Sequence, residues 1–388
     1  MGSYSELFIC NYPIFTLKNN YYHDIVDLIF LESDYTEYEA TVSDEDNPEE
    51  EEIVRFKSFI STAEVCKERL EIFGASYEKA KLDFEESLKI LREDGIYDFV
   101  IYESITFDFY LDTIKRIIES KKSGRKKDVY GGFEDYLYKS ELYIDGQSIS
   151  LGLWSILSVI DSKSIIEYNL TDIIEGGWVQ APQSLINTKK IILLTEGKTD
   201  TEFLKICFNY FFKHLEGYYH FMDFENSKYE ANASRLIHTI KSFVGSGINN
   251  FILAVFDNDS AASKEIENLK KVNLPNNIKV LQYPEIEWAK NYPTLGPTGI
   301  QVMNINGLAG SIEMYLGKDC LMENGEFIPI QWTGYMESIN KYQGVVLKKD
   351  QIQRSFREKV KFFDENNYDL KQWEDLISII TLIKNSWK

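Results

Sequence analysis

The 388-residue sequence predicts an α/β protein with two domains. Residues 1–188 are expected to form a helix-rich α+β domain, and residues 189–388 a mainly parallel sheet flanked by helices. Residues 191–195 and 251–256 are near-continuous apolar runs rich in β-branched side chains, as in strands buried on both faces. Strand and helix patterns alternate after the first of these runs, which indicates βαβ units with right-handed crossovers.

The composition is that of a folded protein, with 44% hydrophobic and 14% aromatic residues. The net charge of −20 at pH 7 argues against a general nucleic-acid coat protein held by Lys and Arg contacts to phosphates. It does not exclude a metal-dependent phosphodiesterase, because bound divalent ions would supply the local positive charge.

Targeting and redox signals point to a cytoplasmic protein. The four cysteines, Cys10, Cys66, Cys207 and Cys320, are scattered without a Cys-x-x-Cys pair, which favours a reducing compartment and argues against a zinc site. The first residues lack the charged start and apolar core of a signal peptide. Charges interrupt each apolar stretch before it reaches membrane-spanning length, so no membrane partner is expected.

In the N-terminal domain, the first fifty residues predict short strands and loops. The acidic stretch 44–52, centred on Pro48, predicts an exposed loop. Residues 62–92 carry apolar side chains at steps of three and four and predict one long helix, and 101–119 predict another. Further apolar runs surround Trp154.

A basic cluster stands out in this acidic chain. It consists of Lys121, Lys122, Arg125, Lys126 and Lys127. A solvated loop is the commonest role for such a cluster, but here it is also the best candidate for contacts with a phosphate backbone.

The domain boundary is placed near residue 188, where Gly176-Gly177, Pro182 and Asn187 interrupt the chain before the first apolar run. Beyond it, the expected helices are 201–215, 234–244 and 261–271, and the further expected strands are 218–224 and 278–283. Residues 292–299 contain two prolines and two glycines and predict a turn-rich loop.

Acidic residues follow both buried strands. Glu196 follows the first strand, with Asp200 four residues later, and Asp257 and Asp259 follow the second. Because ligand sites of parallel sheets lie outside the carboxyl ends of the strands, these acids are expected at one rim, where they would suit Mg²⁺ or Mn²⁺. Taken alone, Glu196 would be a helix-capping acid, but closely packed carboxylates favour a shared cation. Asn258 is either a turn residue or a further oxygen donor.

Glu-Gly-x-x-Asp after one strand and Asp-x-Asp after a later one resemble the signature of the Toprim domain. The resemblance covers roughly residues 188–388 and is to the Toprim domains of topoisomerases, primases, RecR-type proteins and OLD-family nucleases. Gly2-Ser3-Tyr4-Ser5 and Tyr12-Pro13-Ile14-Phe15 resemble an N-terminal domain found beside HEPN and Toprim modules in bacterial defence proteins.

The resemblance implies a nuclease that hydrolyses phosphodiester bonds with two Mg²⁺ or Mn²⁺ ions about 4 Å apart. It implies that the metal ligands are Glu196, Asp200, Asp257, Asp259 and Glu313, and that Glu196 and Lys349 are catalytic. Two of these roles have simpler alternatives. Glu313 follows Ser311, which has the character of an N-cap, so it is also a favourable acid in a first helical turn. Lys348 and Lys349 are otherwise two lysines on a surface helix.

Two motifs of related proteins are missing. A Walker A loop would need glycine where this chain has Ile192, so ATP control would have to come from an ATPase or sensor partner. Arg235 and His238 are too close together for the Arg-x(4–6)-His motif of HEPN ribonucleases.

The sequence therefore predicts a metal-dependent nuclease acting in antiviral defence. DNA is the favoured substrate, with RNA or tRNA as the alternative, and the chain is expected to form a homo-oligomer or a hetero-complex. A non-catalytic, RecR-like nucleic-acid-binding or assembly module is the competing interpretation. A primase-like polymerase is disfavoured because the sequence has no zinc ribbon or nucleotide-binding loop.

Overall fold

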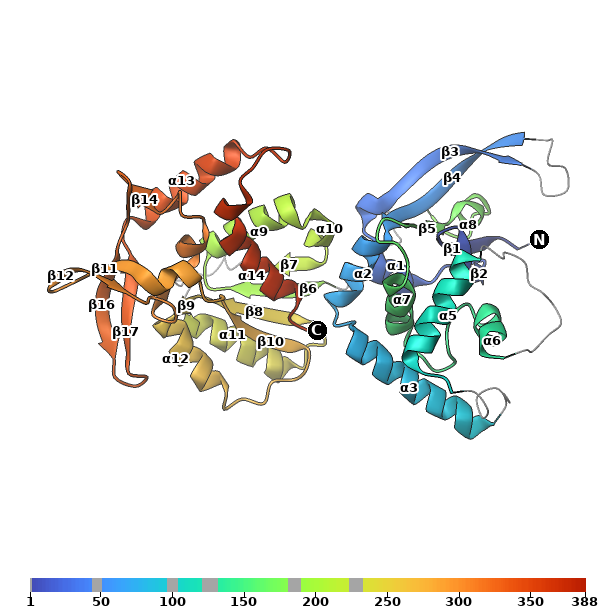
Figure 1. Cartoon of the computed structure of the whole chain (residues 1–388), viewed down its shortest axis with the longest axis horizontal. Coiled ribbons are helices and arrows are strands. Elements are labelled where there is room, and N and C mark those ends of the chain that lie inside the picture. The colour runs from blue at the N-terminus through green and yellow to red at the C-terminus, as the bar shows by residue number, and fades with distance from the viewer. Residues whose placement is uncertain (1, 44–50, 96–103, 121–131, 181–189, 223–232) are drawn as a thin grey trace. The chain divides into compact units, whose positions relative to one another are not determined.

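A computed structural model describes residues 2–43, 51–95, 104–120, 132–180, 190–222 and 233–388 (Figure 1). The chain divides into two compact units, one of residues 1–189 with residues 387 and 388, and the other of residues 190–386. Both units combine helices with sheets, as the sequence predicts. Among the described residues, no helix combines the length and the apolar character needed to cross a membrane.

The first unit is built on a five-stranded antiparallel sheet of order β2-β1-β5-β4-β3. Its strands are β1 (Tyr4–Ile9), β2 (Tyr12–Lys18), β3 (Tyr35–Ser43), β4 (Glu51–Thr62) and β5 (Ile165–Asn169). The helices of this unit are α1 (His23–Ile29), α2 (Ala63–Glu71), α3 (Tyr77–Asp94), α5 (Phe107–Glu119), α6 (Phe133–Lys139), α7 (Ile149–Ser158) and α8 (Thr171–Glu175), with a 3₁₀ turn η1 at Glu32–Asp34.

Three sequence-based expectations for this unit were wrong. The first fifty residues, expected to form short strands and loops, also contain helix α1. The predicted helix 62–92 is two helices, because the chain leaves α2 through Gly74 at φ +95° and Ser76 then caps α3 by accepting from the Lys79 N–H. In the predicted acidic loop, Glu51 and Glu52 begin strand β4, and residues 44–50 lie outside the described part.

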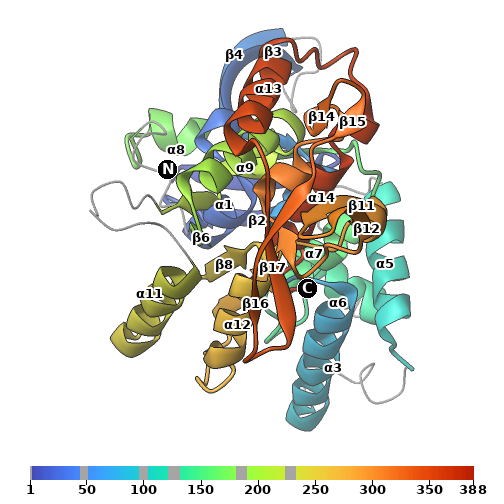
Figure 2. The same cartoon turned by 90° about the vertical axis from the view of Figure 1, so that its left-hand side faces the viewer.

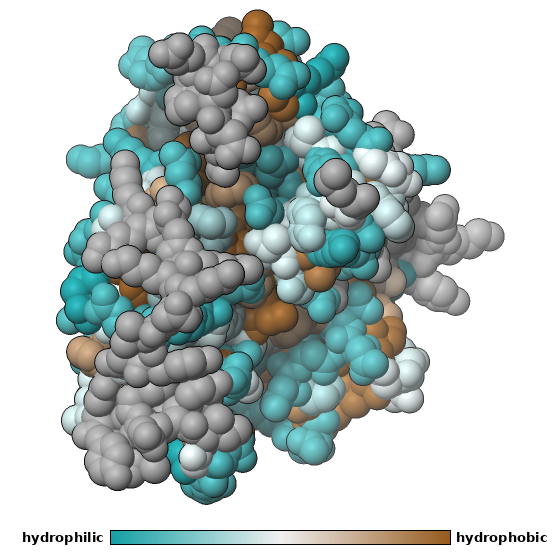
Figure 3. Space-filling model, turned by 90° about the vertical axis from the view of Figure 1, so that its right-hand side faces the viewer, coloured by the Kyte–Doolittle hydropathy of each residue, from teal (hydrophilic) through white to brown (hydrophobic). Residues whose placement is uncertain are grey.

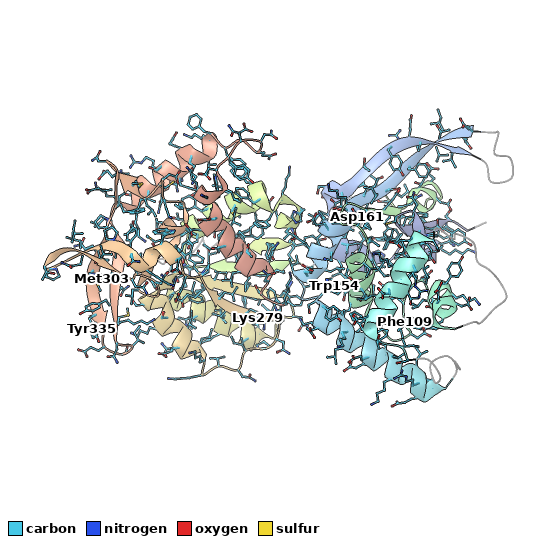
Figure 4. All side chains as sticks on the ribbon, in the orientation of Figure 1. Phe109, Trp154, Asp161, Lys279, Met303 and Tyr335 are labelled. Atoms are coloured by element: carbon cyan, nitrogen blue, oxygen red, sulfur yellow. The ribbon has the colours of Figure 1, made fainter. Side chains whose placement is uncertain are left out.

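The core of the first unit joins the sheet to the helices. Tyr168 of β5 and Tyr110 of α5 are fully buried in one hydrophobic cluster, and the Tyr110 hydroxyl donates to the Leu142 carbonyl at 3.0 Å. Trp154 of α7, labelled in Figure 4, is buried in the same cluster. On the face of this unit that Figure 3 shows, most coloured residues are hydrophilic, and smaller hydrophobic areas lie between them.

The second unit contains a four-stranded, fully parallel sheet of order β10-β8-β6-β7. Its strands are β6 (Ile191–Thr195), β7 (Tyr219–Phe221), β8 (Ile252–Phe256) and β10 (Ile278–Gln282). Helices α11 (Ala233–Ser246) and α12 (Ser260–Leu269) pack on one face, and α9 (Lys198–Phe211) and α14 (Glu374–Lys384) cover the other (Figure 1). Every residue of β8 is buried, which explains its uninterrupted apolar sequence.

A second sheet of this unit corrects the predicted loop at 292–299. These residues form most of the β11–β12 hairpin. The hairpin belongs to a mixed sheet of order β12-β11-β16-β17 (Figure 2). The strands are β11 (Tyr292–Gly296), β12 (Gly299–Met303), β16 (Ile330–Met336) and β17 (Lys341–Val346). Figure 4 labels Met303 on β12 and Tyr335 on β16, both of which are exposed.

Short elements complete the second unit. Strand β9 (Asn258–Asp259) pairs with β13 (Ala309–Gly310), and β17 leads into helix α13 (Lys349–Lys361). The 3₁₀ turn η4 (Ile312–Tyr315) follows β13. The remaining elements are α10 (Lys213–Glu216), η3 (Glu287–Asn291), β14 (Met322–Glu323), β15 (Glu326–Phe327) and η5 (Leu370–Gln372).

Candidate active site

Glu196 and Asp257 leave the same edge of the parallel sheet. Strands β6 and β8 are parallel neighbours with Thr195 opposite Val255, so the residues that follow them lie side by side. The Asp257 backbone N–H donates to Oε1 of Glu196 at 2.9 Å. Burial raises the pKa of Glu196 to about 8, and the nearby carboxylates of Asp259 and Asp200 add to the rise. The Glu196 carboxyl therefore gains from any additional positive charge at this edge.

Asp200 reaches the same edge from the first turn of α9. The helix starts directly after Gly197, and Asp200 is buried at 7% exposure. The Tyr283 hydroxyl donates to Oδ1 of Asp200 at 2.6 Å. Burial nevertheless raises the pKa of Asp200 to about 6, because this hydrogen bond only partly offsets the loss of hydration.

Asp257 is the least compensated acid of the site. Its Oδ1 is buried without a hydrogen-bond partner within the described part of the chain. Burial, followed by the repulsion of Asp200 and Glu196, raises the pKa of Asp257 well above its ordinary value. A buried carboxyl oxygen without a partner is costly, so this atom marks a place for a proton or a cation.

Asp259 has a structural partner as well. It is the N-cap of α12, and its Oδ1 accepts from the Ala262 N–H at 2.8 Å. Burial still raises its pKa, although the hydrogen bond from Ala262 opposes the rise. Capping and metal binding are compatible in principle, because a carboxylate has more lone pairs than one N–H occupies.

Asn258 fixes the loop between the two aspartates. Its Oδ1 accepts from the Gly307 N–H at 2.9 Å and its side chain is buried, so it acts as a tether to the loop before β13. Gln282 holds the same segment from β10, because its Nε2 donates to the backbone carbonyls of Asp257 at 2.9 Å and Asp259 at 3.2 Å. At Gly310, a Cβ would come within 2.7 Å of the Asn258 carbonyl oxygen, which explains the glycine.

Glu313 and Lys349 form an ion pair, with 3.3 Å between Oε2 and Nζ. Ser311 occupies the N-cap position of η4, as expected, but its hydroxyl makes no capping bond and instead donates to Oε2 of Glu313 at 2.6 Å. The Gln353 Nε2 donates to Oε1 at 2.8 Å. Burial alone would raise the pKa of Glu313, but Lys349, Ser311 and Gln353 together hold it below its ordinary value.

The charges of the other acids also affect Lys349. Burial would lower the pKa of its ammonium group, but Glu313 first and Asp257 next outweigh that effect and raise it. Lys348 has a different partner. Its backbone has φ +53°, and its side chain pairs with the exposed Glu323.

The sequence-predicted acids thus influence one another at one edge, but their present arrangement is not a finished metal site. Within the residues that the structure covers, no group of three or more His, Cys, Asp or Glu side chains could hold a metal ion as placed. The donors still fit Mg²⁺ or Mn²⁺ in kind, since they are hard oxygens and Oδ1 of Asp257 lacks a partner.

Three supporting residues were missed by sequence reasoning. Gln282 ends strand β10 and Tyr283 follows it, at the same edge as the acids, so their position at the end of a third parallel strand was an available signal. Gln353 carried no comparable signal, because it contacts Glu313 from a helix 40 positions away. The basic cluster of residues 121–127 lies outside the described residues.

Comparison with known families identifies the first part of the chain. Residues 1–191 match the family model of the HEPN/Toprim N-terminal domain 1. Searches of curated proteins and of solved structures gave no match. A domain of this kind hints at a nuclease-related protein. The match supports a HEPN/Toprim-associated N-terminal domain in this chain.

Proposed function

We propose that residues 190–386 form a divalent-metal-dependent nuclease of the Toprim kind, in a protein of bacterial antiviral defence. The observation that carries the proposal is the Asp257 carboxyl, which is buried among like charges with Oδ1 unpartnered in the described structure. Such a cluster is stabilised by a cation, and nucleases use carboxylate-bound Mg²⁺ or Mn²⁺. The HEPN/Toprim N-terminal domain also supports a nuclease-related function.

The proposed ligands are Glu196, Asp200, Asp257 and Asp259, with Glu313 as the fifth acid that the Toprim resemblance implies. When bound, divalent ions would neutralise charge on the scissile phosphate and on the leaving oxygen. The ammonium of Lys349 is already held at this edge by Glu313, 3.3 Å away. From there it would offset negative charge that develops as the phosphodiester bond breaks.

Metal binding is the first test. Calorimetric titration of metal-free protein with Mn²⁺ should show binding that the double variant Asp257→Ala/Asp259→Ala lacks. The control is Glu323→Gln, since Glu323 is an exposed acid paired with Lys348 and should not affect metal binding. Equal Mn²⁺ binding by the wild type and the double variant would show that Asp257 and Asp259 do not form the proposed metal site.

Cleavage is the second test. The purified protein is incubated with plasmid, linear DNA, phage RNA and tRNA, in Mg²⁺, Mn²⁺ or EDTA. Cleavage of DNA that requires metal and disappears in Glu196→Ala is expected, and cleavage confined to RNA or tRNA would change the substrate class.

A RecR-like, non-catalytic module remains the second candidate. It is favoured by the same finding that, in the described part of the chain, no acid group is arranged to hold a metal. Nucleic-acid binding that is unchanged by EDTA, without cleavage of any of the four substrates, would support this candidate over the nuclease.

A further inference from the structure

Helix α13 presents two side chains to one buried carboxylate. Lys349 and Gln353 are four residues apart, which places them on the same face of the helix. Lys349 pairs with Oε2 of Glu313, and Gln353 donates to Oε1 at 2.8 Å. Both oxygens of Glu313 are therefore engaged by the same helix.

Glu313 is held from its own segment too. The Ser311 hydroxyl donates to Oε2 at 2.6 Å, and the Glu313 side chain is only 3% exposed. A carboxylate that accepts several hydrogen bonds in a buried site has little freedom to turn. Its orientation then determines where the Lys349 ammonium can lie.

The helix itself is anchored beside the carboxylate edge. Arg357 of α13 makes a two-point contact with Glu202, with Nε and the second guanidinium nitrogen Nη2 each 2.7 Å from a carboxylate oxygen. Glu202 belongs to α9, the helix that also supplies Asp200. A planar two-point contact of this type fixes distance and angle together. Helix α13 is thereby tied to α9.

We propose that Gln353 and Ser311 are positioning residues that fix the Glu313 carboxylate, and that Glu313 in turn fixes the position of the Lys349 ammonium. The role of Lys349 in cleavage rests on the proposed function, whereas its orientation by Glu313 does not. A reacting group displaced by about 1 Å can lose about a hundredfold in rate, so such indirect contacts matter for catalysis.

The chain offers a matched control in Gln351. Gln351 lies on the same helix and donates to Glu323 at 3.3 Å, the acid that pairs with Lys348. Gln351→Ala therefore removes the same chemical group from the exposed lysine pair. Alanine is the best helix former, so both glutamine variants should keep α13 intact.

The test measures the orientation of Lys349 without any nuclease assay. The full-length protein is treated briefly with limiting acetic anhydride, and acetylation of Lys348 and Lys349 is quantified by mass spectrometry. If Gln353 keeps Glu313 oriented toward Lys349, its loss should free the Lys349 amine and increase Lys349 acetylation several-fold in Gln353→Ala. Lys348 acetylation should stay constant in that variant, and Gln351→Ala should leave Lys349 at the wild-type level.

Ser311 provides an independent arm from a different segment. Ser311→Ala should increase Lys349 acetylation, and Ser311→Thr, which keeps the hydroxyl, should restore the wild-type level. Unchanged Lys349 acetylation in both Gln353→Ala and Ser311→Ala overturns the positioning role, and so does an equal increase in Gln351→Ala.

Activity separates this inference from the proposed function. If the chain is a nuclease, Gln353→Ala should lower kcat roughly tenfold with KM unchanged, because only transition-state contacts weaken. Increased Lys349 acetylation in a protein without nuclease activity would uphold the positioning role and refute the proposed function. Metal-dependent cleavage with unchanged Lys349 acetylation would support the proposed function and refute the positioning role.

Discussion

Lys348 and Lys349 are consecutive lysines with side chains of similar exposure, 48% and 42%, but they pair with acids that differ in burial. Lys348 pairs with Glu323, which also accepts a hydrogen bond from Gln351. Lys349 pairs with Glu313, which also accepts one from Gln353. The Glu323 side chain is 37% exposed and the Glu313 side chain 3% exposed.

From this difference we infer that the burial of the acid, more than its chemical identity, decides what each ion pair contributes. In water, an ion pair contributes little, because hydration competes and salt screens it. In the buried group, each remaining charge needs a partner, so removing one partner leaves the others uncompensated.

The largest predicted effect is on catalysis and distinguishes the two lysines. Lys349→Ala should lower kcat by about a hundredfold or more, since a charge-assisted donor to the transition state is lost. Lys348→Ala should retain nearly wild-type kcat. Single-turnover cleavage at saturating substrate measures both, and calorimetry with Mn²⁺ checks that metal binding survives. Similar losses of kcat in the two variants, or a loss confined to substrate affinity, would show that Lys349 has no catalytic role distinct from that of Lys348.

The buried acids also predict a pH dependence of stability. Burial raises the pKa of Glu196 from 4.5 to about 8 and that of Asp200 from 3.8 to about 6. Between these ordinary and raised values the folded chain binds more protons than the unfolded chain, so the free energy of unfolding should fall as pH rises from about 4 to about 8. Above pH 8 this contribution should level off.

Thermal unfolding of the full-length protein in EDTA, from pH 5 to pH 9, measures this dependence. Glu196→Gln, which cannot ionise, should flatten the fall between pH 6 and pH 8. Mg²⁺ should raise Tm more at pH 8 than at pH 5, because it competes with protons for the same carboxylates. A wild-type Tm that fell no more steeply than that of Glu196→Gln would contradict the raised pKa.

The sequence was sufficient to predict the elements whose signal is local. Strands β6 and β8 are buried on both faces, so their apolar runs are uninterrupted, and the acids that follow them necessarily share an edge. Helices α9, α11 and α12 begin within three residues of their predicted starts. In each case, periodicity within a dozen residues carries the information.

Features that depend on distant partners could not be predicted. The 292–299 segment contains turn-forming residues, yet β11 is a strand that pairs with the adjacent β12 and with β16, whose partner residues lie 36 positions further on. Gln353 has no local feature that distinguishes it from Gln351, since only the packing of α13 decides which glutamine meets the buried acid. Tertiary context overrides local preference at both places.

The smallest predicted effect comes from the exposed pair. Glu323→Gln removes the charge that faces Lys348 but leaves an oxygen acceptor, and exposed ion pairs contribute little in water. Tm, Mn²⁺ affinity and kcat should therefore all remain at wild-type values in this variant. Glu313→Gln makes the identical chemical change in the buried pair and should lower kcat and alter Tm, because Lys349 loses its buried counter-ion. Measuring both variants at 50 mM and 500 mM salt sharpens the comparison. Only the exposed pair should be sensitive to screening, and a Glu313→Gln variant indistinguishable from Glu323→Gln would show that burial does not separate the two lysines.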